Sequence, residues 1–184
     1  MEERLKEIFA NVNDWLKFAE AKNGVLVAFN GSALVLVMST LLNKENLTFV
    51  IHHWYLIVLV GYFIFFAALG LIIALLSFLA QISPTWFRVK EEPKDTDNLL
   101  FYRDIAKYDK NNVTPYLEKL SHIISPDREE EMTQMEKLYA NQIITNSQIA
   151  VRKYKFFNAS LWCTILAFTT PLGAAIAATL NKEE

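Results

Sequence analysis

Three stretches of the chain carry no charged residue and are apolar on all sides of a helix. They are Gly24–Leu42, Trp54–Ile82 and Leu161–Leu180, with 19, 29 and 20 residues. A bilayer core about 30 Å thick needs roughly 20 helical residues at 1.5 Å each, so each stretch is long enough to cross it. A soluble domain of this size could bury one such helix but hardly three. The pattern predicts transmembrane helices at 24–42, 54–82 and 159–180.

The residues before the first span have the mixed pattern of a surface helix. Leu5, Ile8, Val12 and Ala19 belong to a set of apolar positions that recurs every 3.6 residues among charged ones. This spacing predicts an amphipathic helix over residues 1–23 that leads directly into the first span.

The segment 83–158, between the second and third spans, is also predicted to be helical. Thr114–Pro115 offers a cap and a first-turn proline for a helix that ends at Ile124. The last predicted helix meets no Gly or Pro before Pro171 and can therefore continue into the third span. The predicted helices are Asn98–Tyr108, Thr114–Ile124 and one that starts at Asp127. No stretch alternates as a β-strand does, so the predicted fold is all-α.

Lysine and arginine counts predict the orientation. The first 23 residues carry four of them, the loop Asn43–His53 carries only Lys44, and Ser83–Asn158 carries twelve. Basic segments stay on the cytoplasmic side of a membrane. The N-terminus and residues 83–158 are therefore predicted to be cytoplasmic, in a multi-pass protein of the bacterial inner membrane.

Composition and motifs exclude several classes of function. The net charge of −2 offers no basic field for a nucleic acid polymer. Phosphate-binding loops, dinucleotide fingerprints, zinc-protease motifs and nucleophile elbows are absent from the sequence. Cys163 is the only cysteine, and the adjacent His52 and His53 would point apart on a helix. We therefore predict no catalytic residues, metal site or cofactor.

Polar residues gather where the first span begins. Glu20, Lys22 and Asn23 stand at its entrance, and Asn30 lies inside it. Lipid offers no hydrogen-bond partner, so groups at that depth must find one within the protein. Asn30 is either an intramolecular contact or a group that meets its own copies in an oligomer or lines a water path. The four residues are candidates for a membrane-embedded polar or assembly site.

Three short stretches resemble a known family. Glu20-Ala21-Lys22-Asn23-Gly24, followed by Ala28-Phe29-Asn30-Gly31, is similar to the opening of the transmembrane effectors of bacterial Pycsar antiphage systems. Leu99–Ala106 and the segment from Asn141 to Tyr154 are also similar, and the layout agrees over nearly the whole chain. The resemblance implies an effector that impairs the inner membrane when a partner cyclase makes a cyclic pyrimidine nucleotide, cCMP or cUMP. Abortive infection would follow.

If the ligand is a nucleotide, as the resemblance implies, its binding residues are expected among the basic and aromatic residues of the segment 83–158. A cyclic phosphate favours a guanidinium or ammonium group, and a base favours an aromatic face. Two clusters meet this description. A helix with an apolar face and solvated charges would also explain the first, and positive-inside topology explains the second better than ligand binding does. The candidate ligand-binding residues are Tyr102, Arg103, Lys107 and Tyr108 in the first cluster and Arg152 and Lys153 in the second.

Other functions stay open. A lone three-helix monomer has no room for a lumen, so permeation would require a homo-oligomer in the lipid bilayer. Related membrane effectors of cyclic-oligonucleotide (CBASS-like) systems share much of the layout. A non-enzymatic membrane adaptor would use residues 83–158 to dock a partner. A membrane enzyme is disfavoured because no catalytic cluster is found.

Overall fold

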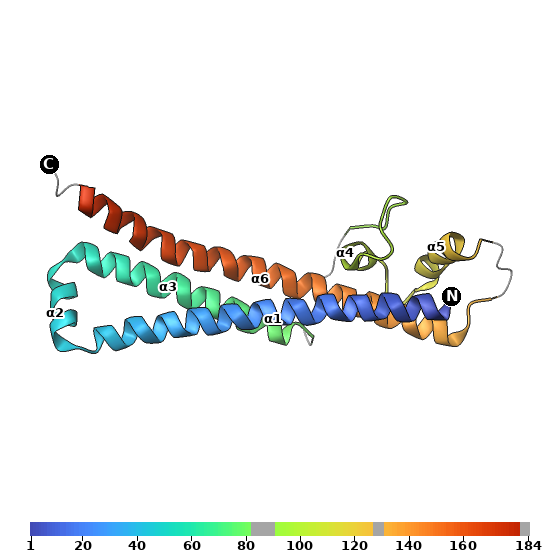
Figure 1. The fold of residues 1–184 in the computed structure, drawn as a ribbon, viewed down its shortest axis with the longest axis horizontal. Coiled ribbons are helices and arrows are strands. Elements are labelled where there is room, and N and C mark those ends of the chain that lie inside the picture. The colour runs from blue at the N-terminus through green and yellow to red at the C-terminus, as the bar shows by residue number, and fades with distance from the viewer. Residues whose placement is uncertain (82–90, 127–130, 181–184) are drawn as a thin grey trace. The chain divides into compact units, whose positions relative to one another are not determined.

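The computed structural model describes residues 1–81, 91–126 and 131–180, with only the backbone described at residues 80–81, 170 and 172–180. In this part of the chain every regular element is a helix, which confirms the all-α fold class (Figure 1). The α-helices are α1 (Glu2–Leu41), α2 (Lys44–His52), α3 (Trp54–Leu76), α4 (Tyr102–Ile105), α5 (Thr114–Ile124) and α6 (Gln134–Leu180), and a short 3₁₀ helix, Ser77–Gln81, follows α3.

The chain divides into two compact units, and the helices α1 and α6 contribute to both. The charged unit comprises Met1–Ala21 and Leu79–Lys155. The apolar unit comprises Lys22–Phe78 and Phe156–Glu184. Because α1 is one unbroken helix, the predicted surface helix and the predicted first span are continuous through Asn23 and Gly24.

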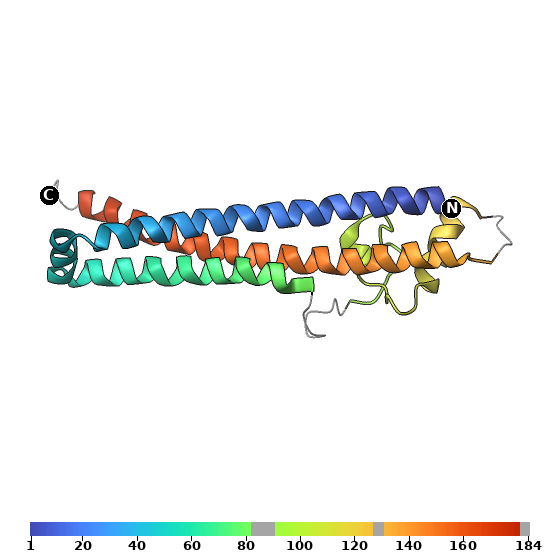
Figure 2. The ribbon, with the colours of Figure 1, turned by 90° about the horizontal axis from the view of Figure 1, so that it is seen from below.

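The apolar unit exposes many large side chains and buries mostly small or polar ones. The short helix α2 joins the ends of α1 and α3 (Figure 2). Ala67 of α3 and Ala167 of α6 are fully buried, and the rings of Phe63 and Phe168 meet edge to face at 5.2 Å. Large residues face outward instead, among them Val25, Phe29, Val35 and Leu36. In water this arrangement would leave much of the apolar surface uncovered.

Two helices of the described residues are long and apolar enough to cross a membrane. They are α1 and Trp54–Leu79, whose most apolar windows have mean hydropathies of 1.9 and 2.9 and are only 11% and 17% buried. A core helix of a soluble protein would be mostly buried, unlike these. The third predicted span, 159–180, lies in α6, and most of its last half is described by backbone alone. The count of three spans stays a prediction.

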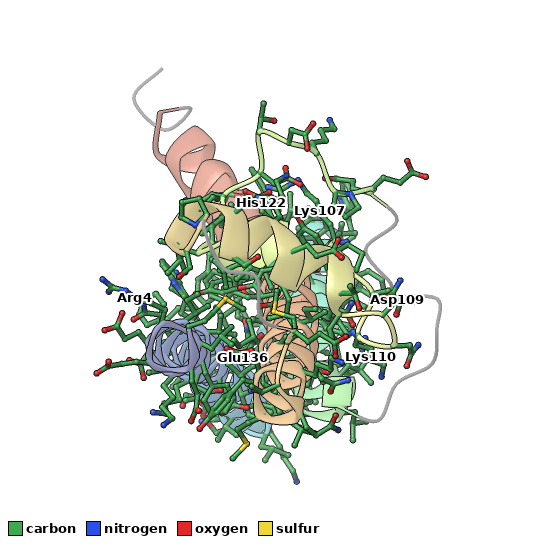
Figure 3. All side chains as sticks on the ribbon, turned by 90° about the vertical axis from the view of Figure 1, so that its right-hand side faces the viewer. Arg4, Lys107, Asp109, Lys110, His122 and Glu136 are labelled. Atoms are coloured by element: carbon green, nitrogen blue, oxygen red, sulfur yellow. The ribbon has the colours of Figure 1, made fainter. Side chains whose placement is uncertain are left out.

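The charged unit has the opposite arrangement, with a core of large apolar side chains. Helix α5 lies across the N-terminal parts of α1 and α6 (Figure 3). The fully buried Tyr116 donates from its hydroxyl to the main-chain carbonyl of Leu99 at 3.1 Å, which fixes the turn before α4. The core residues include Leu5, Ile8, Val12, Ile105, Leu117, Leu120, Ile143 and Ile144.

The helix α5 has the predicted bounds, Thr114–Ile124, with its proline in the first turn, but its N-cap residue is Val113 and not the predicted Thr114. The prediction for Asn98–Tyr108 was wrong in length, since the helix there covers only Tyr102–Ile105. Asn98 explains the difference, because its side-chain oxygen accepts a hydrogen bond from the main-chain N–H of Leu100 at 2.9 Å. This Asx turn competes with helix formation.

The last helix begins at Gln134 rather than at Asp127, which lies outside the described residues. A capping box sets this start. The main-chain N–H of Glu136 donates to the Thr133 hydroxyl at 3.2 Å, and the Glu136 carboxylate accepts from the main-chain N–H of Thr133 at 3.0 Å. Beyond this point α6 is unbroken to Leu180, as predicted for the last helix.

The predicted loop Asn43–His53 contains the helix α2. Asn43 caps it, with its side-chain oxygen accepting from the main-chain N–H of Glu45 at 2.9 Å. The basic residues Arg88 and Lys90, which contribute to the predicted orientation, lie outside the described residues.

Candidate functional site

A polar contact joins α1 and α6 inside the apolar unit. The fully buried Asn30 donates from its side-chain nitrogen to the hydroxyl of Thr164 at 2.9 Å. Thr164 lies 2.9 Å from the carbonyl of Ser160, one turn earlier in α6, and can donate to it. Asn30 therefore has an intramolecular partner at a depth where lipid supplies none.

Close packing between α3 and α6 supports this contact. The hydroxyl of Ser160 donates to the main-chain carbonyl of Gly70 at 2.8 Å. A Cβ atom at Gly70 would lie 3.3 Å from the Cβ of Cys163 and 3.4 Å from the side-chain nitrogen of Asn30. Glycine at this position therefore lets the two helices approach, as small residues do in membrane proteins. We refer to Asn30, Gly70, Ser160 and Thr164 as the polar seam.

The other residues predicted at the span entrance have separate surroundings. The ammonium of Lys22 lies 5.2 Å from the ring centre of Phe157, within range for a cation–π interaction. Asn23 is fully buried in the apolar unit. In the charged unit, Glu20 pairs with the buried Lys153, their charged atoms 3.1 Å apart. This pair joins α1 to α6.

The charge of Lys107 is occupied within the fold. Its ammonium lies 2.8 Å from the Asp104 carboxylate and 2.6 Å from that of Asp97, and the lysine side chain is 8% exposed. Hydrogen bonds to Asp104 and then to Asp97 raise the pKa of Lys107 to about 12. These contacts hold Asp97, in the turn before α4, next to the end of α4.

The aromatic residues of the first predicted cluster are divided between the core and the surface. Tyr108 is buried and meets Tyr116 edge to face at 5.3 Å. Tyr102 stacks on Tyr154 at 5.3 Å and also lies 5.4 Å from the ring centre of Trp15. Burial raises the pKa of Tyr102 and of Tyr108 above the usual value of 10. Tyr102 thus joins an aromatic group that includes Trp15.

The remaining basic candidates differ in exposure. Arg103 is exposed on α4, whereas Arg152 of α6 is half-buried, and its burial lowers the pKa of the guanidinium. Lys107 and Lys153 are engaged with carboxylates.

Sequence reasoning missed the partners of Asn30. Ser160 and Thr164 stand four residues apart in an apolar run, and this spacing places both on one face of a helix. That signal was available, but the pairing with Asn30 spans 134 residues and has no local trace.

A comparison with protein families gives a match over almost the whole chain. The family model for the Pycsar effector protein domain (PycTM) matches residues 4–180. Searches of curated proteins and of solved structures give no match. The family match covers both the charged unit and the apolar unit, apart from a few terminal residues. The chain therefore belongs to the Pycsar effector family.

Proposed function

We propose that the chain is a non-enzymatic antiphage effector of the bacterial inner membrane. A cyclic pyrimidine nucleotide, cCMP or cUMP, made by a partner cyclase activates it, and the active form impairs membrane integrity so that the infected cell stops growing or dies. The observation that carries the proposal is the family match over residues 4–180, in a chain with two exposed apolar helices of membrane-spanning length.

The surface of the apolar unit supports a membrane setting. Val35 and Leu36 on α1 are 70% and 68% exposed, and Val58 and Phe65 on α3 are 59% and 61% exposed. Contact of such faces with lipid costs no free energy, whereas their exposure to water is unfavourable. With the counts of lysine and arginine, this supports three spans with the N-terminus and residues 83–158 in the cytoplasm.

Permeation requires assembly in this proposal, because the polar seam is small and filled by its own side chains. Activation then shifts an equilibrium between a closed form and an assembled homo-oligomer. A ligand drives that shift only through preferential binding to one state. A change from almost all closed to almost all open needs about 5.5 kcal/mol of differential binding.

The test measures membrane potential in cells that express the full chain with its partner cyclase or with a catalytically inactive cyclase. We expect depolarisation and loss of viability only with the active enzyme. Cells with the chain and the inactive cyclase control for toxicity of overexpression. Unchanged potential with the active cyclase, despite confirmed nucleotide production, would contradict the proposal. Activation by cyclic oligonucleotides alone would instead assign the chain to a CBASS-like system.

A further inference from the structure

A hollow in the charged unit lies between α1, the turn before α4 and the end of α5. We call it the α1–α5 groove, and its volume is about 450 Å³. This volume falls within the range of small-molecule pockets, roughly 300–1,000 Å³. A smaller hollow of about 300 Å³ shares Asn11 and Leu100 with it and extends to Trp15. The two hollows therefore adjoin along one surface of α1.

One face of α1 lines this surface from end to end. Arg4, Ile8, Asn11 and Trp15 follow one another at steps of four, three and four residues, which places them on a single helix face. The order along the face is a cation, an apolar residue, an amide and an aromatic ring. A guanidinium recognises a phosphate, an amide pairs with the polar edge of a base, and an indole offers a stacking surface.

The opposite wall is largely apolar, apart from Asp97 and Asn98, and is held in place. Leu99, Leu120 and Ile123 line it, and Ile123 is 69% exposed. The hydrogen bond from Tyr116 to the carbonyl of Leu99 fixes the turn that forms part of this wall. An apolar wall with a few polar groups opposite is typical of a binding pocket for a small ligand.

The charges around the groove suit a ligand with one negative charge. The acidic residues that line the two hollows are each paired with a cation: Glu7 with Arg4, Asp14 with Lys17 and Asp97 with Lys107. The Arg4–Glu7 pair is exposed, with side chains 64% and 56% accessible, and such pairs exchange partners at little cost. Figure 3 shows Arg4 pointing outward from α1. Arg4 can therefore turn to a phosphate, whereas Lys107 is held by two buried contacts.

We propose that the α1–α5 groove binds the activating cyclic mononucleotide, with the phosphate at Arg4 and the base toward Asn11. The inference rests on the proposed function and adds the location of the ligand site. The bound nucleotide would join α1 to α5, and α1 continues as one helix to Leu41.

The test is equilibrium binding of labelled cCMP and cUMP to the full chain in nanodiscs. Arg4→Ala should weaken binding by at least about tenfold, since it removes charge-assisted hydrogen bonds. Lys6→Ala is the matched control, because Lys6 also lies on the first turns of α1 in an exposed ion pair and does not line the groove. It should bind as the wild type does.

A second pair of variants tests the apolar wall. Ile123→Glu places a negative charge in the groove and should also weaken binding at least about tenfold, whereas Leu138→Glu, at an exposed position outside the groove, should not. Wild-type affinity in both Arg4→Ala and Ile123→Glu would overturn the groove site and leave the proposed function standing. A wild-type chain that binds neither nucleotide would overturn both.

Discussion

The two units are built on the same two helices but bury opposite kinds of residue. In the charged unit α1 and α6 bury large apolar side chains such as Leu5 and Ile143. In the apolar unit the same helices bury Asn30, Ser160 and Thr164 and expose residues such as Leu36. Each of these two helices therefore packs through large apolar residues in one unit and through small or polar residues in the other.

The contrast identifies the solvent of each unit. Water drives large apolar side chains inward, so a core of leucine and isoleucine stabilises the charged unit. Lipid gives no such drive, and association there depends on close packing of small residues and on hydrogen bonds between helices. Gly70 and the polar seam fit the second case. Substitutions in the two units should therefore have different effects.

The largest effect is expected for loss of a core side chain in the charged unit. Ile143→Ala should lower its free energy of unfolding by about 2–5 kcal/mol, because Ile143 is fully buried and leaves a cavity. The matched Leu36→Ala, at an exposed position of α1, should change stability by less than about 0.5 kcal/mol. Hydrogen exchange of the chain in nanodiscs measures both. Equal losses would mean that Leu36 also packs in a core.

A charge on the lipid-facing surface of the apolar unit should give the next largest effect. Val35→Asp should oppose membrane insertion of the first span by about 2.5–3.5 kcal/mol, since the position is central in the apolar stretch and exposed. Leu138→Asp, on the exposed surface of α6 in the charged unit, is the control and should be nearly neutral. The fraction of integrated chains in a membrane insertion assay measures the difference. Full insertion of Val35→Asp would show that α1 does not face lipid there.

Local patterns predicted the long helices and α5, but not α2, the length of α4 or the pairing between helices. The 3.6-residue spacing gave the all-α fold, and Thr114–Pro115 gave the start of α5, because these signals lie within a few residues. The start of α6 was missed, although the Thr133–Glu136 capping box is visible in the sequence, since Ser125–Pro126–Asp127 offers a similar local signal.

The candidate sites depended on contacts between distant parts of the chain. Lys107 is ten residues from Asp97, and its position in the sequence does not show that its charge would be occupied. Asn30 stands out in the sequence as a polar group in an apolar helix, but its partner Thr164 could not be chosen from the spacing. The face formed by Arg4, Asn11 and Trp15 was hidden because α1 was interpreted only by its apolar positions.

A smaller effect is expected at the polar seam. Asn30→Leu should lower the stability of the apolar unit by about 0.6 kcal/mol and by no more than about 1.7 kcal/mol, since it removes one hydrogen bond between helices. Ser39→Ala, which removes only a contact within α1, is the control. Steric trapping or mild denaturant titration in detergent measures the stability. Cyclase-dependent depolarisation should persist, because Asn30 has its partner within the chain. Its loss, with insertion intact, would assign Asn30 to a water path.

The smallest effect concerns how the stability of the charged unit falls at acid pH. The hydrogen bond from Lys107 lowers the pKa of Asp97 below its usual value of 3.8, and a weaker contribution comes from the main-chain N–H of Lys94. A carboxyl group with a lowered folded pKa stabilises the fold above its unfolded pKa, and this contribution is lost as the pH falls through the folded value. Asp97→Asn should therefore reduce the melting temperature at pH 7 and make it fall less steeply below about pH 3.8, the usual pKa of the group. Asp14→Asn removes only an exposed pair with Lys17 and should follow the wild-type curve. Parallel curves for Asp97→Asn and the wild type would show that Lys107 relies on Asp104 alone, and that the turn before α4 is held by its apolar contacts rather than by charge.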